Sequence, residues 1–192
     1  MYQTKLLESK SMRGNTINAL MTTLDEKSEE TKAHTLRLSD ICLKIAEQLE
    51  QHTEIKNRLA LLAVLHDIGK VGIPDHILGK PEALTEDEWQ IMKTHPEIGY
   101  RIASNVPELH AVANEILHHH EKWDGTGYPS GLKGEKIPIN CRILSVVDSY
   151  DAMTNDRVYR KARTHEQAMD ELRRFAGIQF DPIIVAAFAA IY

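Results

Sequence analysis

The sequence lacks the features expected of membrane, secreted and duplex-binding proteins. No apolar run approaches the roughly 18 residues that a membrane-spanning helix needs, and the N-terminal MYQTKLLESK has no apolar signal core. A net charge of −5 provides no basic field for duplex nucleic acid. The two cysteines, Cys42 and Cys141, both lie in apolar segments, which indicates buried thiols in a reducing compartment. We therefore expect a cytoplasmic protein, or the cytoplasmic part of a longer one.

Alternating apolar and polar residues of the kind that form strands are also missing. Apolar residues instead recur at three- and four-residue steps, as in Leu38, Ile41, Ile45 and Leu49. Residues 58–68 are apolar nearly all round, which is typical of a buried central helix. Residues 124–138 hold several glycines and prolines and predict a long loop, of a length that is often functional. The pattern predicts an all-α fold.

The chain divides into two expected regions. Residues 1–27 predict an amphipathic helix with a thin apolar stripe, and residues 28–192 predict the main domain. The stripe has little to bury against alone, so it could pair with a second copy of itself. A frayed surface helix explains the same residues equally well.

Two helix ends can be predicted from local chemistry. Thr85 and Glu88 fit a capping box that opens a helix. That helix is expected to end near His95, because the residue before a proline, here Pro96, disfavours helical geometry.

Potential metal ligands gather at helix ends and on apolar helix faces. Each has an ordinary explanation when taken alone; a histidine at a helix C-terminus, for example, is favoured by the helix dipole. The ordinary explanations do not account for the whole set, because burial of polar groups costs several kcal/mol unless they are paired or bound to a metal. The set is Glu30, His34, His66, Asp67, His95, His119, His120 and Asp148.

The composition of this set indicates the chemistry. It contains no thiolate, and imidazole with carboxylate suits iron, manganese, zinc or nickel. Eight ligands are too many for one ion but fit two or three, and paired metals bridged by a carboxylate and a hydroxide are a common device for phosphoester hydrolysis. Lys70, Arg157 and Arg160 follow the ligands in the chain and could hold phosphate, although each alone could be an ordinary surface cation.

Several long motifs resemble one known family. HDIGK at residues 66–70 resembles the core motif of the HD superfamily of metal-dependent phosphohydrolases. HHEKWDGTGYPSGLKGEKIP, from residue 119, resembles the signature of its HD-GYP branch. KTHPEIGYRI lies between these two motifs, and VVDSYDAMTNDRVYRKA and GIQFDP come after them, in the same order as in the family. The resemblance covers about residues 28–190 and predicts an HD-type helical bundle with a long GYP loop.

The resemblance implies a bacterial phosphodiesterase that hydrolyses cyclic di-GMP to pGpG or GMP with two or three divalent metal ions. Iron and manganese are the expected ions. Asp67 would bridge the metals, Lys70 would contact the scissile phosphate, and Tyr128 would pack on the substrate. The implied phosphate contacts are Arg157 and Arg160. The implied metal ligands are His34, His66, Asp67, His95, His119, His120 and Asp148, with Glu30 supporting a third metal and His118 spare.

The same resemblance implies an output domain that follows a sensor or receiver module, with residues 1–27 as the connection and a possible homodimer contact. Three other functions are compatible with the sequence. They are an HD enzyme for another nucleotide, a catalytically silent cyclic-dinucleotide receptor, and a metal-binding or interaction domain.

Overall fold

The computed structural model describes residues 17–24, 26–27, 32–155 and 161–192. Over these residues the fold is helical, with one isolated bridge between Ala176 and Phe180 and no strand, so the predicted all-α class is confirmed. The elements are α2 (Lys32–Gln48), α3 (Thr53–Leu65), η1 (Ile68–Gly72), α4 (Asp75–Leu78), α5 (Glu86–Met92), α6 (His95–Ser104), η2 (His110–Val112), α7 (Ala113–His118), η3 (Gly134–Lys136), α8 (Ile139–Thr154), α9 (His165–Arg174) and α10 (Pro182–Ile191).

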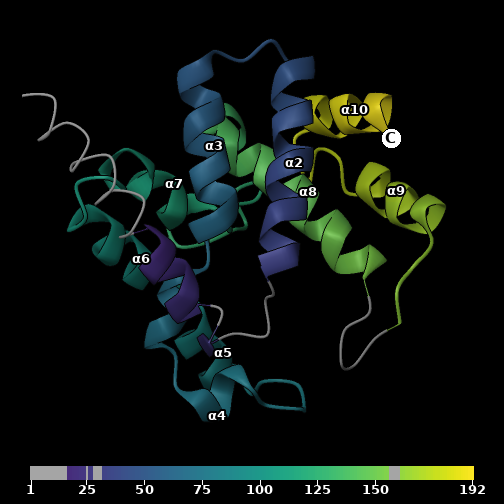
Figure 1. Ribbon diagram of the computed structural model, residues 1–192. Coiled ribbons are helices and arrows are strands. Elements are labelled where there is room, and N and C mark those ends of the chain that lie inside the picture. The colour runs from purple at the N-terminus through teal and green to yellow at the C-terminus, as the bar shows by residue number, and fades with distance from the viewer. Residues whose placement is uncertain (1–16, 25, 28–31, 156–160) are drawn as a thin grey trace, which may run out of the picture.

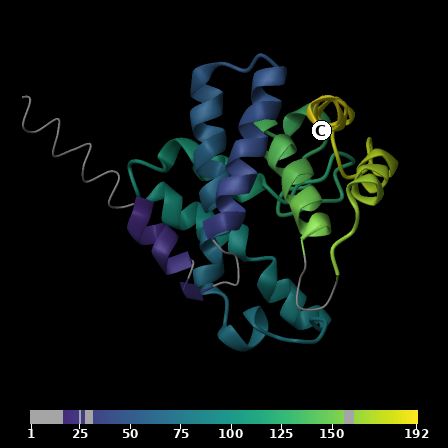
Figure 2. The same ribbon diagram turned by 45° about the vertical axis from the view of Figure 1, so that its right-hand side comes forward.

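The centre of the bundle is formed by α2, α3 and α8 (Figure 1). Helices α2 and α3 stand side by side as a hairpin, and α8 packs against both of them. In Figure 2 α8 runs beside α2, while α9 and α10 lie on the opposite side of the molecule from α6. The apolar spacing seen in the sequence explains this arrangement, because Leu38, Ile45 and Leu62 are fully buried between these helices.

The predicted helix ends are partly confirmed. Thr85 and Glu88 form the expected capping box at the start of α5. The prediction that His95 closes this helix is wrong, because α5 ends at Met92 and His95 opens α6. Pro96 lies in the first turn of α6, where the missing N–H of a proline costs no helical hydrogen bond.

The described part of residues 1–27 packs on the main domain. Residues 17–24 are helical, and Leu24, only 3% exposed, belongs to the core. Ile17, Leu20 and Met21 pack against the same core. The described part of the apolar stripe, residues 17–24, therefore contacts this chain's own bundle, and the boundary at residue 27 stays a prediction. In the described part of the chain, no helix is long and apolar enough to cross a membrane.

Candidate metal centre

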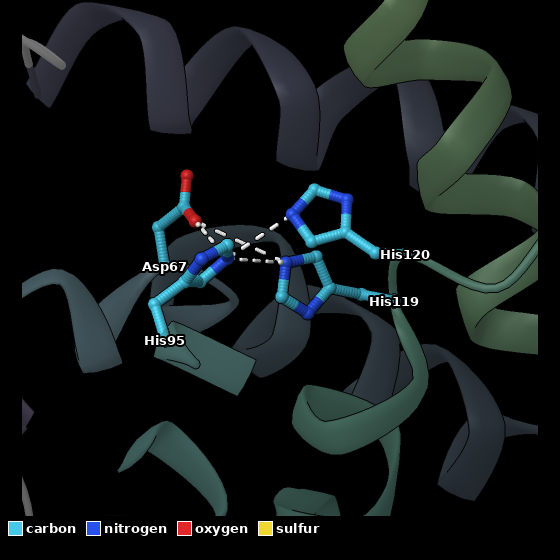
Figure 3. Close-up of side chains that lie close together, drawn as sticks. All are labelled: Asp67, His95, His119 and His120. Atoms are coloured by element: carbon cyan, nitrogen blue, oxygen red, sulfur yellow. Dashed lines mark hydrogen bonds and ion pairs between the residues drawn. The ribbon is translucent and has the colours of Figure 1, made fainter. Parts of the chain in front are cut away.

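Three segments that are distant in the sequence bring four potential ligands together. Asp67 lies between α3 and η1, His95 begins α6, and His119 and His120 directly follow α7. Their ligand atoms all lie within 4.8 Å of one another. Figure 3 shows the four side chains pointing toward a common centre. We call these four residues the His/Asp cluster.

The ring nitrogens of the cluster face one another at short range. His95 Nε2 lies 3.3 Å from His119 Nε2 and 3.0 Å from His120 Nε2. Asp67 Oδ1 lies 3.1 Å from His95 Nε2 and 3.9 Å from His119 Nε2. Asp67, His95 and His119 are each at most 5% exposed, so these polar atoms meet inside the protein.

Backbone contacts determine which nitrogen carries the proton in the rings of His95 and His119. His95 Nδ1 lies 2.8 Å from Met92 O, and His119 Nδ1 lies 2.6 Å from Ile116 O. A carbonyl oxygen can only accept, so each Nδ1 donates and each neutral ring presents an unprotonated Nε2 to the centre. Two nitrogen lone pairs 3.3 Å apart repel each other, and a cation between them removes the conflict.

The pKa shifts favour the forms that bind metals. Burial, followed by the neighbouring histidines, lowers the pKa of His119 well below its usual value and that of His120 to about 3. Burial alone would raise the pKa of Asp67, but the charge of the neighbouring Lys70 ammonium holds it well below its ordinary value. Neutral imidazoles and an ionised carboxylate are the forms that coordinate metals.

The second oxygen of Asp67 faces different neighbours. Asp67 Oδ2 lies 2.7 Å from Lys70 Nζ and 3.2 Å from His66 Nε2. His66 Nδ1 lies 3.2 Å from Ala63 O, so His66 also presents Nε2 to the carboxylate. The Asp67 carboxylate thus lies between His95 and His119 on one side and His66 with Lys70 on the other.

His34 and Asp148 lie beside Asp151, to which the sequence analysis gave no role. His34 Nε2 lies 3.9 Å from Asp148 Oδ1, and neither residue is part of the four-residue cluster. His34 Nδ1 lies 2.6 Å from Asp151 Oδ2, and Asp151 also accepts a hydrogen bond from Arg37 Nε at 3.1 Å. Asp151 follows Asp148 by three residues on α8, and this helical spacing was the available signal.

Three predicted site residues, Glu30, Arg157 and Arg160, lie outside the described residues. The prediction of a third metal near Glu30 and of two phosphate contacts therefore stays a prediction.

The GYP loop, residues 124–138, contacts the His/Asp cluster through Tyr128. The Tyr128 ring stacks on His120, with centroids 4.9 Å apart and an interplanar angle of 29°. His118 turns away toward this loop: its Nδ1 donates to Asn114 O, and its Nε2 lies 3.1 Å from Ser130 Oγ. His118, the first of three consecutive histidines, therefore contacts this loop and is not part of the His/Asp cluster.

Glu121 also holds the loop, and the sequence reasoning gave it no role. Its buried carboxylate accepts backbone hydrogen bonds from Ser130 N at 2.8 Å and Leu132 N at 3.0 Å. Its position, directly after the two ligand histidines, was the only signal in the sequence.

We expect Glu121→Gln to destabilise the protein by about 1–3 kcal/mol, because an amide has a single oxygen and loses one of the two charge-assisted hydrogen bonds from Ser130 N and Leu132 N. Urea unfolding of the metal-free protein measures the change. Glu135→Gln, at an exposed position of the same loop, is the matched control and should be neutral. Equal stability of the two variants would contradict the assigned role of Glu121.

Comparison with known proteins shows the family to which the chain belongs. A family model described as HD domain matches residues 18–184, so the chain belongs to the HD domain family. A cyclic di-GMP phosphodiesterase of Vibrio cholerae is 42% identical over 96% of this chain and 40% of its own length. A cyclic di-GMP phosphodiesterase of Thermotoga maritima is 45% identical over 83% of this chain and 44% of its own length.

Solved structures share the fold. A cyclic GMP-AMP-specific phosphodiesterase of V. cholerae, V-cGAP3, superposes with a TM-score of 0.69 at 22% identity, over 92% of this chain and 47% of the other. The HD-type helical fold and the family resemblance predicted from the motifs are therefore confirmed. The chain spans less than half the length of these relatives.

Proposed function

We propose that this chain is a metal-dependent phosphodiesterase that hydrolyses cyclic di-GMP to pGpG or GMP. The observation that carries the proposal is the convergence of unprotonated imidazole nitrogens and one ionised carboxylate at a buried centre. Relatives that are 42% and 45% identical bear the name cyclic di-GMP phosphodiesterase, which supports the substrate.

The His/Asp cluster fits one metal ion, because its four ligand atoms lie within 4.8 Å of one another, and we propose a second ion beside it. His95, His119 and His120 would hold one ion with Asp67 Oδ1, and His66, His34 and Asp148 would hold the other. Glu30 would support a third, and iron or manganese suits this mixture of imidazole and carboxylate. When bound, such ions would activate water and polarise the phosphoryl oxygens, which is the chemistry of phosphoester hydrolysis.

The side chains around the metal ligands would place the substrate. The Lys70 ammonium, 2.7 Å from Asp67, adds positive charge where a phosphate would gather negative charge. Tyr128 would pack on the nucleotide, and Arg157 and Arg160 would hold its phosphates. Burial raises the pKa of the thiols of Cys42 and Cys141, so neither cysteine is suited to nucleophilic attack.

We also propose that the domain serves as the cytoplasmic output of a longer signalling protein. The relatives are more than twice as long as the part that this chain matches, which supports an upstream sensor or receiver domain. Residues 1–27 would connect the two and could join two copies as a homodimer.

The test is hydrolysis of cyclic di-GMP by protein loaded anaerobically with iron(II) or manganese(II). We expect turnover to pGpG or GMP that is lost in His66→Ala/Asp67→Ala and retained in the control Asp170→Ala, which changes an exposed carboxylate on α9. The same assay is also run with cyclic GMP-AMP and with nucleoside mono- and triphosphates as substrates.

Other results would favour the other functions. Tight binding of cyclic di-GMP without turnover would favour a receptor, and turnover of another nucleotide alone would favour a different HD enzyme. If the protein neither binds nor hydrolyses any of these nucleotides, the remaining function is that of a metal-binding or interaction domain.

A further inference from the structure

A row of three aromatic rings leads from the His/Asp cluster to the protein surface. His120, in the cluster, stacks on Tyr128. Tyr128 in turn meets Trp89 edge to face, with centroids 6.4 Å apart and an interplanar angle of 80°. Trp89 is 42% exposed. We call Trp89 and Tyr128 the aromatic shelf.

Core packing does not explain the position of Trp89. Helix α5, which carries it, has no buried residue at all. A large ring that is 42% exposed leaves much of its apolar area in water, although burial of that area would stabilise the fold. The ring is therefore available to a ligand at the edge of the candidate metal centre.

The helix that presents Trp89 is firmly held at its start. Thr85 and Glu88 form the capping box, and Lys80 Nζ lies 2.6 Å from Glu88 Oε2. Glu88, the residue next to Trp89, is thus tied to two other positions of the chain. A ring on such a support loses little freedom when a flat ligand stacks on it.

We propose that the aromatic shelf binds one purine base of the nucleotide whose phosphate lies at the His/Asp cluster. This rests on the proposed function, since it assigns a base site next to the proposed phosphate site. A base is separated from its phosphate by one sugar, and the shelf begins at Tyr128, which stacks on His120, a member of the cluster. Purines offer the largest π-face among the bases, and aromatic side chains bind such faces by stacking.

Stacking on the shelf predicts a particular kinetic signature. The contact involves only the face of the base and is remote from the phosphate, so it strengthens binding without changing the chemical step. Its loss should raise KM and leave kcat nearly unchanged. Stacking alone tolerates any purine, so guanine and adenine should both occupy the shelf.

The test compares Trp89→Ala with Ile91→Ala on the metal-loaded protein. Ile91 is the matched control because it lies on the same helix and is also 42% exposed. We expect Trp89→Ala to raise KM for cyclic di-GMP by roughly 10-fold or more, with kcat within about twofold. Trp89→Phe, which keeps a ring, should recover most of the affinity. Inhibition by inorganic phosphate, which has no base, should be the same in all variants.

Two results would overturn the proposal. One is an equal KM for Trp89→Ala and Ile91→Ala. The other is a fall in kcat and a weakening of phosphate inhibition that accompany the rise in KM, which would show that Trp89 only supports the fold.

Fluorescence separates this proposal from the proposed function. The chain has two tryptophans, so the difference between wild type and Trp89→Phe reports Trp89. Saturable quenching of that difference by cyclic di-GMP or GMP is expected even if no turnover occurs. If no quenching occurs while the nucleotide binds, the shelf does not hold the base.

Discussion

Replacing Asp67 with asparagine should remove bound metal and lower phosphodiesterase activity by about 100-fold or more, since even the loss of a group that only supports a metal ligand costs 10–100-fold in affinity. The carboxylate lies between His95 Nε2 at 3.1 Å and His66 Nε2 at 3.2 Å, and its charge is held by Lys70. A neutral amide presents an N–H₂ group to one of these sides, where it cannot act as a ligand.

Metal content measured on the purified protein, together with turnover of cyclic di-GMP, checks this prediction. Asp170→Asn is the control, because Asp170 is exposed on α9 and contacts only Arg173 among the interactions found for it. Full metal content in Asp67→Asn would show that the His/Asp cluster does not depend on this carboxylate.

Gly69→Ala should destabilise the protein by about 3 kcal/mol, at the upper end of the range for an overfilled site, because backbone and not a flexible side chain lies in the way. A Cβ atom at residue 69 would lie 1.8 Å from His95 O and 2.6 Å from Gly99 N. Segment η1 and helix α6 would have to separate. That movement would carry His95 away from Asp67, so loss of bound metal should accompany the loss of stability.

Gly79→Ala is the matched control for the same change of residue. Gly79 has a φ of −96°, and its added Cβ would meet only Asp75 O at an ordinary 3.5 Å. Both variants reduce the freedom of the unfolded chain by a similar amount, so the difference between them reports the folded state. Urea unfolding of the metal-free proteins should place Gly79→Ala within about 0.5 kcal/mol of wild type. Similar midpoints for the two variants would contradict the close contact at Gly69.

Local patterns predicted the helical elements well where one segment contains all the relevant information. The capping box of Thr85 and Glu88 depends on four consecutive residues, and it forms as expected. The end of the helix near His95 was mispredicted, because the rule for a residue before proline does not tell whether a helix stops or a new one begins. Helix α5 ends at Met92, and α6 begins at His95 with Pro96 in its first turn.

Contacts between distant segments could not be predicted in the same way. Asp151 binds His34 across 117 positions of sequence, and neither residue carries a local sign of the other. Glu121 is likewise explained only by the fold of the loop, whose amides at Ser130 and Leu132 turn back toward it.

The sequence by itself determined the helical class, the family motifs and the types of ligand that the chain offers. These follow from local periodicity and from the chemistry of imidazole and carboxylate, which need no neighbours to be recognised. The tertiary structure decided which nitrogen each ring presents, that Asp67 lies between two groups of ligands, and that Trp89 stands exposed beside Tyr128. The physical reason is that tautomer, pKa and exposure depend on atoms that only folding brings within a few ångströms.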